Sequence, residues 1–150
     1  MSTVVQRAHS PLGASSAERW MNCSASVRLI DLVKKAARFE EEAPDYQSQG
    51  VNAHMLAAHC LDNDLDCWQL MALPVWSFVD VQMSNAVQTY LDYVRSRKGT
   101  RRVEYRMHRP EIHPLFYGTL DCDAEPPADD PIKLEIIDYK NGAGIAVDVE

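Results

Sequence analysis

Two different hydrophobic periodicities divide this sequence, and the change between them near Gly99 restricts the fold more than any other feature. Before that point apolar residues recur at helical spacing, as they do from Val79 to Arg97. From Arg102 to His108 apolar and polar residues alternate, which is the pattern of a strand with one buried face. Helices followed by strands, rather than alternating with them, predict an α+β fold.

We expect three helices in the first part of the chain. Ser15 and Glu18 have the spacing of a capping box, so a first helix should begin there and end within the charged stretch 34–42. A second helix should run over 48–61 and a third over 79–97. At 100° per residue the second helix would place on one arc Val51, His54, Met55, Ala58 and Leu61.

The second part of the chain predicts three strands, over 102–108, 117–124 and 132–140. We expect an antiparallel meander on which the N-terminal helices pack. Residues 1–14 lack periodicity and are interpreted as a flexible tail, so that 15–150 would form one domain of ordinary size.

Charge is distributed very unevenly along the chain. The formal net charge of −7 argues against binding of nucleic acid through bulk positive charge. Residues 121–150, however, contain nine acidic and two basic residues, so the first 120 residues are neutral. A net negative charge therefore does not exclude nucleic acid as a partner.

The sequence also indicates where the protein resides. No apolar run approaches the ~20 residues needed to cross a bilayer, and residues 1–13 do not have the pattern of a signal peptide. The four cysteines contain no C-x-x-C pair, which argues against a zinc knuckle and favours reduced thiols. We therefore expect a cytoplasmic protein that does not associate with membranes.

Carboxylates follow the apolar parts of two neighbouring strands. Leu134, Ile136, Asp138 and Lys140 would share one face of the third strand, with Asp121 close by if the strands pair. Charged groups that follow buried aliphatics are costly unless they are paired or bind a metal, and crowded carboxylates attract hard cations such as Mg²⁺ or Mn²⁺. The alternative is an ordinary Asp–Lys pair at the end of a strand.

These residues also carry a resemblance to a known family. Residues 118–121 (Gly-Thr-Leu-Asp) and 136–140 (Ile-Ile-Asp-Tyr-Lys) resemble the Gly-x-x-Asp and (Asp/Glu)-x-Lys motifs of the PD-(D/E)XK nuclease superfamily. Residues 19–23, 49–54 and 58–61 are similar to the upstream helical motifs of its RecB-like branch. The match spans nearly the whole chain, and it is nearest to uncharacterised RecB-like nuclease domains of phages and prophages.

The resemblance implies a restriction-endonuclease-like core and specific roles. Asp121 and Asp138 would ligate a catalytic Mg²⁺ or Mn²⁺ with the backbone carbonyl of Tyr139, and His54 would complete the ligand set. Lys140 would activate the attacking water. Without the resemblance, a hydrogen-bonded core histidine is the favoured interpretation of His54.

The sequence departs from the family pattern in three places. Gln49-Gly50-Val51 replaces the usual Glu-Gly-Thr, which would remove an auxiliary acid. Late cysteines that would join Cys23 around an iron–sulfur cluster are missing, so we expect no cluster. The chain ends at Glu150, after the third core strand, so a missing C-terminal segment or a second chain would be needed to complete the fold.

A basic cluster at the junction of the third helix and the first strand is the candidate DNA interface. Such a cluster could follow a phosphate backbone, although a solvated helix end is the simpler interpretation. The residues concerned are Arg95, Arg97, Lys98, Arg101, Arg102 and Arg106.

Together, these features favour a metal-dependent DNA nuclease of phage or prophage type, acting in the cytoplasm of a bacterial host. The main alternative is a catalytically degraded module that keeps the nuclease fold and binds DNA or another protein. A small-molecule enzyme that uses the same acids has no motif in its support.

Overall fold

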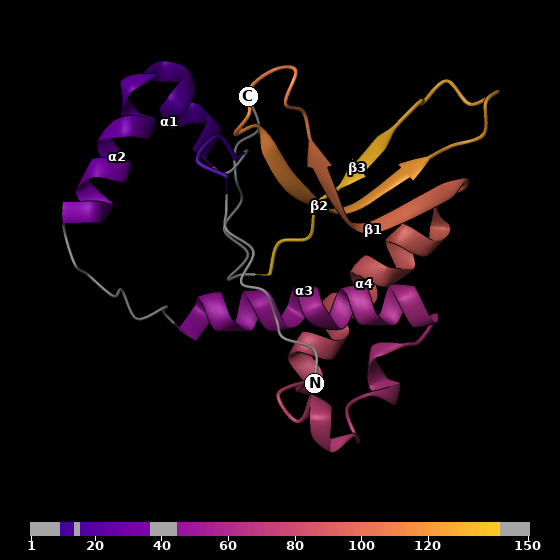
Figure 1. Ribbon diagram of the computed structural model, residues 1–150. Coiled ribbons are helices and arrows are strands. Elements are labelled where there is room, and N and C mark those ends of the chain that lie inside the picture. The colour runs from indigo at the N-terminus through magenta and orange to yellow at the C-terminus, as the bar shows by residue number, and fades with distance from the viewer. Residues whose placement is uncertain (1–9, 14–15, 37–44, 142–150) are drawn as a thin grey trace. The chain divides into compact units, whose positions relative to one another are not determined.

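The residues for which the sequence predicts a single first helix form two helices in the structure. In the computed structural model, which describes residues 10–13, 16–36 and 45–141, α1 covers Ala17–Asn22 and α2 covers Ala25–Ala36 (Figure 1). Cys23 has an extended backbone, with φ −145° and ψ 95°. Its N–H donates to the Arg19 carbonyl, and α1 ends there. Asn22, Cys23 and Ser24 all have low helix propensity, which explains why the single helix expected here is wrong.

The expected capping box at Ser15 and the tail over 1–14 fall largely outside the described residues. Ser16 precedes α1, but its side chain does not cap that helix. Its hydroxyl instead donates to the Gly13 carbonyl at 3.0 Å. Ser10 to Gly13 form a turn, in which the Gly13 N–H donates to the Ser10 carbonyl at 3.0 Å.

The chain forms two compact units, and the candidate site lies in the larger one. The smaller unit consists of Met1–Glu41 and Arg106–Thr119, and the larger of Glu42–Tyr105 and Leu120–Glu150. Within the smaller unit, the N–H of Arg109 donates to the carbonyl of Phe116 at 2.9 Å at the tip of the β-hairpin. The larger unit contains the hydrophobic core.

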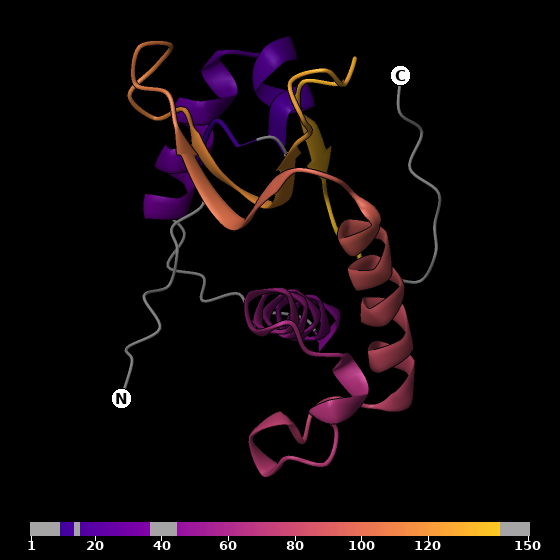
Figure 2. The same ribbon diagram turned by 90° about the vertical axis from the view of Figure 1, so that its right-hand side faces the viewer.

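Two long helices build that core. α3 covers Asp45–Asn63, longer than expected at both ends, and α4 covers Val81–Ser96, close to its expected range. Asp80 caps α4, since its carboxylate accepts the Met83 N–H at 2.7 Å. Figure 2 looks nearly along α3, which lies beside α4. The short 3₁₀ helices η2 (Cys67–Gln69) and η3 (Pro74–Trp76) connect them.

The buried face of α3 is not the arc expected from the sequence. Val51 and Met55 are 67% and 47% exposed. The buried residues are instead Ala53, Leu56, Ala57 and Cys60. Two alanines on this face let α4 approach closely, so side-chain size decided the buried face where hydrophobicity alone did not. From α4 the core receives Val87, Tyr90, Leu91 and Val94.

The sheet has three strands in the order β1-β2-β3, which confirms an α+β fold with an antiparallel sheet. β1 covers Thr100–His108, β2 covers Tyr117–Glu125 and β3 covers only Glu135–Ile137. In the β2–β3 register, Cys122 pairs with Ile137. A third strand over 132–140 is therefore wrong in its length, because the turns that include Asp130 and Pro131 delay its start.

The two faces of β3 are also the reverse of those expected. Leu134 and Ile136 are 48% and 58% exposed, whereas Ile137 and Tyr139 are buried against α3 and α4. The premise that buried aliphatics lead into Asp138 and Lys140 is therefore wrong. Asp138 and Lys140 follow the exposed face of this segment.

The junction between α4 and β1 requires a glycine. Gly99 has φ +103°, and a Cβ built there would lie 2.0 Å from the carbonyl oxygen of Glu125. Nearby, the Arg102 guanidinium holds the buried carboxylate of Asp123 and thereby joins β1 to β2. Within the described residues no helix is long and apolar enough to cross a membrane.

Candidate metal centre

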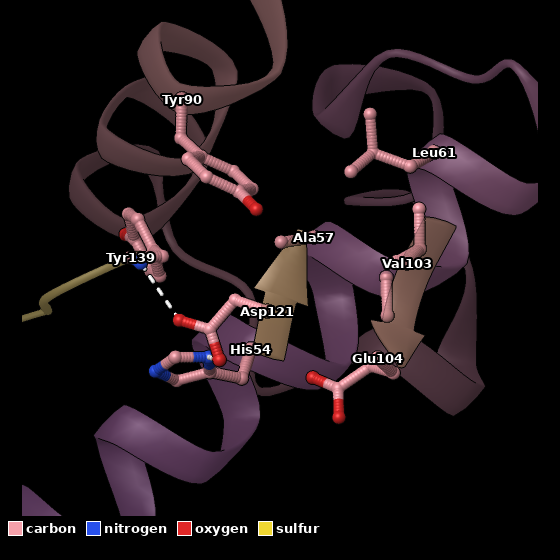
Figure 3. Close-up of a pocket in the computed structure, with 9 residues that line it drawn as sticks. His54, Ala57, Leu61, Tyr90, Val103, Glu104, Asp121 and Tyr139 are labelled. Carbon is pink, nitrogen blue, oxygen red and sulfur yellow. Dashed lines mark hydrogen bonds and ion pairs between the residues drawn. The ribbon is translucent and has the colours of Figure 1, made fainter. Parts of the chain in front are cut away.

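His54 and Asp121, both partly buried, are in direct contact in the larger unit. α3 carries His54 and β2 carries Asp121, and the His54 Nδ1 lies 3.3 Å from the Asp121 Oδ1 (Figure 3). The other carboxylate oxygen, Oδ2, accepts the backbone N–H of Tyr139 at 2.7 Å. These two contacts orient the carboxylate, so two of the residues assigned to a site from the sequence are in direct contact.

Glu104 is a third member of this group, and the sequence did not indicate it. One potential ligand atom from each of His54, Glu104 and Asp121 lies within 4.8 Å of the other two. A divalent cation is held by donors at about this mutual separation. The only signal in the sequence was that Glu104 is the single acid among the bases of the 95–109 segment.

An unusual backbone conformation accompanies Glu104. Its φ is +49°, a left-handed value that is uncommon for residues other than glycine and asparagine. Val103 and Glu104 both line the same small pocket, although neighbours on a regular strand point to opposite faces. The local distortion of β1 therefore turns the Glu104 carboxylate toward His54 and Asp121, as Figure 3 shows.

The electrostatics of the pair favour a charged carboxylate. The hydrogen bond to Asp121 raises the pKa of His54 above 6.5, while burial opposes this shift. Burial alone would raise the pKa of Asp121, but the bonds from His54 and from the Tyr139 N–H together lower it below 3.8. Glu104 adds negative charge near His54, and Lys140 adds positive charge near both members of the pair.

Asp138 and Lys140 lie next to this centre but outside the group of three donors. Both side chains are exposed, and the Lys140 Nζ lies 2.6 Å from the Asp138 Oδ2. Tyr139 between them is buried, with its ring edge-on to His54 at 5.3 Å between centroids. Tyr139 contacts Asp121 through its N–H, a role that the sequence did not suggest for it.

Most of the predicted basic interface contacts the protein itself. Arg95 binds Asp66 and the Leu65 carbonyl, each at 2.7 Å, and Arg102 binds the buried Asp123. The remaining contacts hold the guanidinium groups of Arg97 against Tyr93, Arg101 on the Val94 carbonyl and Arg106 over Tyr117. Lys98 is exposed. A role of this cluster in DNA binding stays a prediction.

The donor set fits a small, hard cation better than an organic ligand. The pocket is small and partly open to solvent, and three of its lining residues offer an imidazole nitrogen or a carboxylate oxygen. One imidazole and two carboxylates suit Mg²⁺ or, better, Mn²⁺, which accepts nitrogen as well as oxygen ligands. His54, Glu104 and Asp121 would hold the ion.

The fold and the site thus define an α+β protein with a candidate centre for a divalent cation. Residues 9–150 match the model of the family described as "Protein of unknown function (DUF2800)", and the chain belongs to this family. Neither the curated proteins nor the solved structures provide a match to the chain.

Proposed function

We propose that this protein is a metal-dependent nuclease that hydrolyses DNA phosphodiester bonds with Mg²⁺ or Mn²⁺. The observation that carries the proposal is the cluster of His54, Glu104 and Asp121 around one small pocket. His54 and Asp121 are also two of the positions at which the sequence resembles the RecB-like branch of the PD-(D/E)XK nucleases. In that interpretation the sheet and α3 belong to a restriction-endonuclease-like core.

The residues around the pocket have chemistry that suits phosphodiester hydrolysis. A bound divalent cation would polarise the phosphodiester and lower the pKa of water. Asp121 is kept ionised at neutral pH by His54 and by the Tyr139 N–H, and Glu104 supplies a second carboxylate. Lys140 places an ammonium group near Asp121, where it would orient the attacking water and stabilise charge that develops on the phosphate.

One observation favours a second candidate, a degraded nuclease-fold module that binds DNA or another protein. Asp138, expected as a ligand, is exposed and pairs with Lys140 outside the group of three donors. A site that had lost one carboxylate ligand would bind a cation weakly or not at all. This module would bind its partner without cleaving it.

The test compares cleavage of single- and double-stranded DNA in Mn²⁺ by the wild type and by Lys140→Ala. Lys133→Ala is a matched control, because Lys133 is an exposed lysine whose Nζ donates to the carbonyls of Ala128 and Asp130 in a surface loop. We expect Lys140→Ala to reduce the cleavage rate about 100-fold or more, and Lys133→Ala to cleave like the wild type.

Calorimetric titration with Mn²⁺ separates the two candidates. A nuclease should bind Mn²⁺, and Asp121→Asn should abolish that binding. A wild-type protein that neither cleaves DNA nor binds Mn²⁺, but retains DNA in a gel-shift assay, would establish the binding module instead.

A further inference from the structure

Tyr90 on α4 contributes a hydroxyl group to the same pocket. The residue lies on α4, is only 8% exposed, and lines the pocket together with His54, Glu104 and Asp121. Its hydroxyl makes no hydrogen bond to any residue in the described part of the chain. In Figure 3 the hydroxyl points from α4 into the pocket, toward Ala57.

Packing accounts for the ring of Tyr90 but not for its hydroxyl. The ring contacts Tyr139 at 5.0 Å between centroids and belongs to the hydrophobic core. A phenylalanine would make the same ring contacts without burying a polar atom, and a buried hydroxyl without a partner destabilises a fold. A buried polar group of this kind points to a ligand that is held there.

The groups around the Tyr90 hydroxyl determine whether it donates a hydrogen bond to such a ligand or accepts one from it. Burial, together with the nearby thiol of Cys122 and the carboxylates of Asp121 and Glu104, raises the pKa of Tyr90 well above its usual value. The hydroxyl therefore stays protonated and acts as a hydrogen-bond donor. Ala57, Leu61 and Val103, which also line the pocket, have no side-chain acceptor to offer it.

We propose that Tyr90 is a further residue of the cation site, and that its hydroxyl donates a hydrogen bond to a water oxygen that accompanies the bound ion. His54, Glu104 and Asp121 would hold the ion, and Tyr90 would position the water on the α4 side of the pocket. The inference rests on the proposed function, because it requires that the three donors bind a cation. Tyr90 is in this sense a positioning residue.

The test uses Tyr90→Phe in the full chain, which keeps the ring and removes only the hydroxyl. Tyr93→Phe is the matched control, because Tyr93 lies on the same helix but is exposed, and its hydroxyl donates to Glu135 at 2.8 Å. Calorimetry with Mn²⁺ alone measures the dissociation constant, and thermal unfolding without metal measures the stability of each variant.

We expect Tyr90→Phe to raise the Mn²⁺ dissociation constant about three- to ten-fold, the effect of one lost hydrogen bond, and Tyr93→Phe to leave it unchanged. The metal-free Tm of Tyr90→Phe should equal or exceed that of the wild type, since an unpaired buried hydroxyl is removed. A purely structural role for Tyr90 predicts the reverse, a lower metal-free Tm.

Two results would overturn the inference, and they differ in what else they reject. If the wild type binds Mn²⁺ through His54 and Tyr90→Phe binds it within about two-fold as tightly, Tyr90 has no part in the site, but the proposed function stands. If the wild type and His54→Ala both fail to bind Mn²⁺, the cation site itself is rejected, and the role of Tyr90 with it.

Discussion

Asp121 and Asp123 lie two positions apart on β2 but have different electrostatic partners. Asp123 is only 1% exposed, and its carboxylate is held by the Arg102 guanidinium. Asp121 faces His54 instead, with Glu104 close by, and no arginine among the described residues pairs with its carboxylate. Asp123 thus stabilises the fold through its ion pair, whereas the carboxylate of Asp121 is placed where it could bind a cation.

Replacing Arg102 should destabilise the fold strongly. Arg102→Met keeps most of the aliphatic stem but leaves the Asp123 carboxylate buried without its partner, which typically costs about 3–5 kcal/mol. We expect a loss at the lower end of this range, because Arg102 is partly exposed. Urea denaturation of the metal-free protein measures it.

The control for this prediction is Arg106→Ala, which removes an exposed guanidinium that lies over the Tyr117 ring. It should cost less than about 1 kcal/mol. Equal losses of stability in the two variants would show that the Arg102–Asp123 pair stabilises the fold no more than the Arg106 side chain does.

Two glycine substitutions should change stability in opposite directions. Gly99→Ala would bring a Cβ against the Glu125 carbonyl in a left-handed backbone conformation, so we expect a loss of about 2 kcal/mol or more. Gly50→Ala meets no atom within 4 Å and lies inside α3, where alanine should stabilise by roughly 0.5–1 kcal/mol. Thermal unfolding of both variants checks the signs, and a stabilising Gly99→Ala would contradict the structure of this junction.

The helical part of the fold was predictable where local signals agreed. α4 has a capping aspartate, Asp80, and a regular apolar repeat, and it begins and ends within two residues of its expected range. The break at Cys23 was missed because three weak helix formers in a row interrupt the helix without glycine or proline. The buried face of α3 was misjudged because it depends on the close approach of α4, which sequence periodicity does not contain.

The candidate site was predictable only in part. His54 and Asp121 were found from their motifs, and the structure brings them together. Glu104 was missed because strand alternation grouped it with the polar, outward residues Arg106 and His108. Its positive φ comes from the local distortion of β1, and no glycine marks this distortion in the sequence.

The His54–Asp121 pair predicts a specific pH dependence of stability without metal. The pKa of His54 is raised above 6.5, so its contribution is complete below that value and is lost as the pH rises through the raised pKa. The pKa of Asp121 is lowered below 3.8, so its contribution is complete above that value and is lost in acid. The wild type should therefore exceed His54→Gln in stability most between about pH 4 and 6.5.

Denaturation of both proteins across this range, without metal, measures the difference. Mn²⁺ affinity should follow the opposite trend and increase from about pH 6 to 8, because the cation competes with the proton on His54. A stability difference that does not change between about pH 5 and 8 would mean that His54 and Asp121 do not form a titrating pair.

Glu104 is expected to combine a ligand role with backbone strain, and three substitutions separate the two. Glu104→Gln should weaken Mn²⁺ binding at least about ten-fold, since an amide replaces a charged ligand.

Glu104→Ala and Glu104→Gly both remove the carboxylate, but only glycine adopts a φ of +49° without strain. The glycine variant should therefore be more stable than the alanine variant by about 1 kcal/mol. At Arg106, where φ is not positive, alanine should be the more stable of the same two replacements. Urea denaturation without metal compares the alanine and glycine variants at both positions. If alanine is the more stable replacement at position 104, as it should be at position 106, Glu104 is not strained.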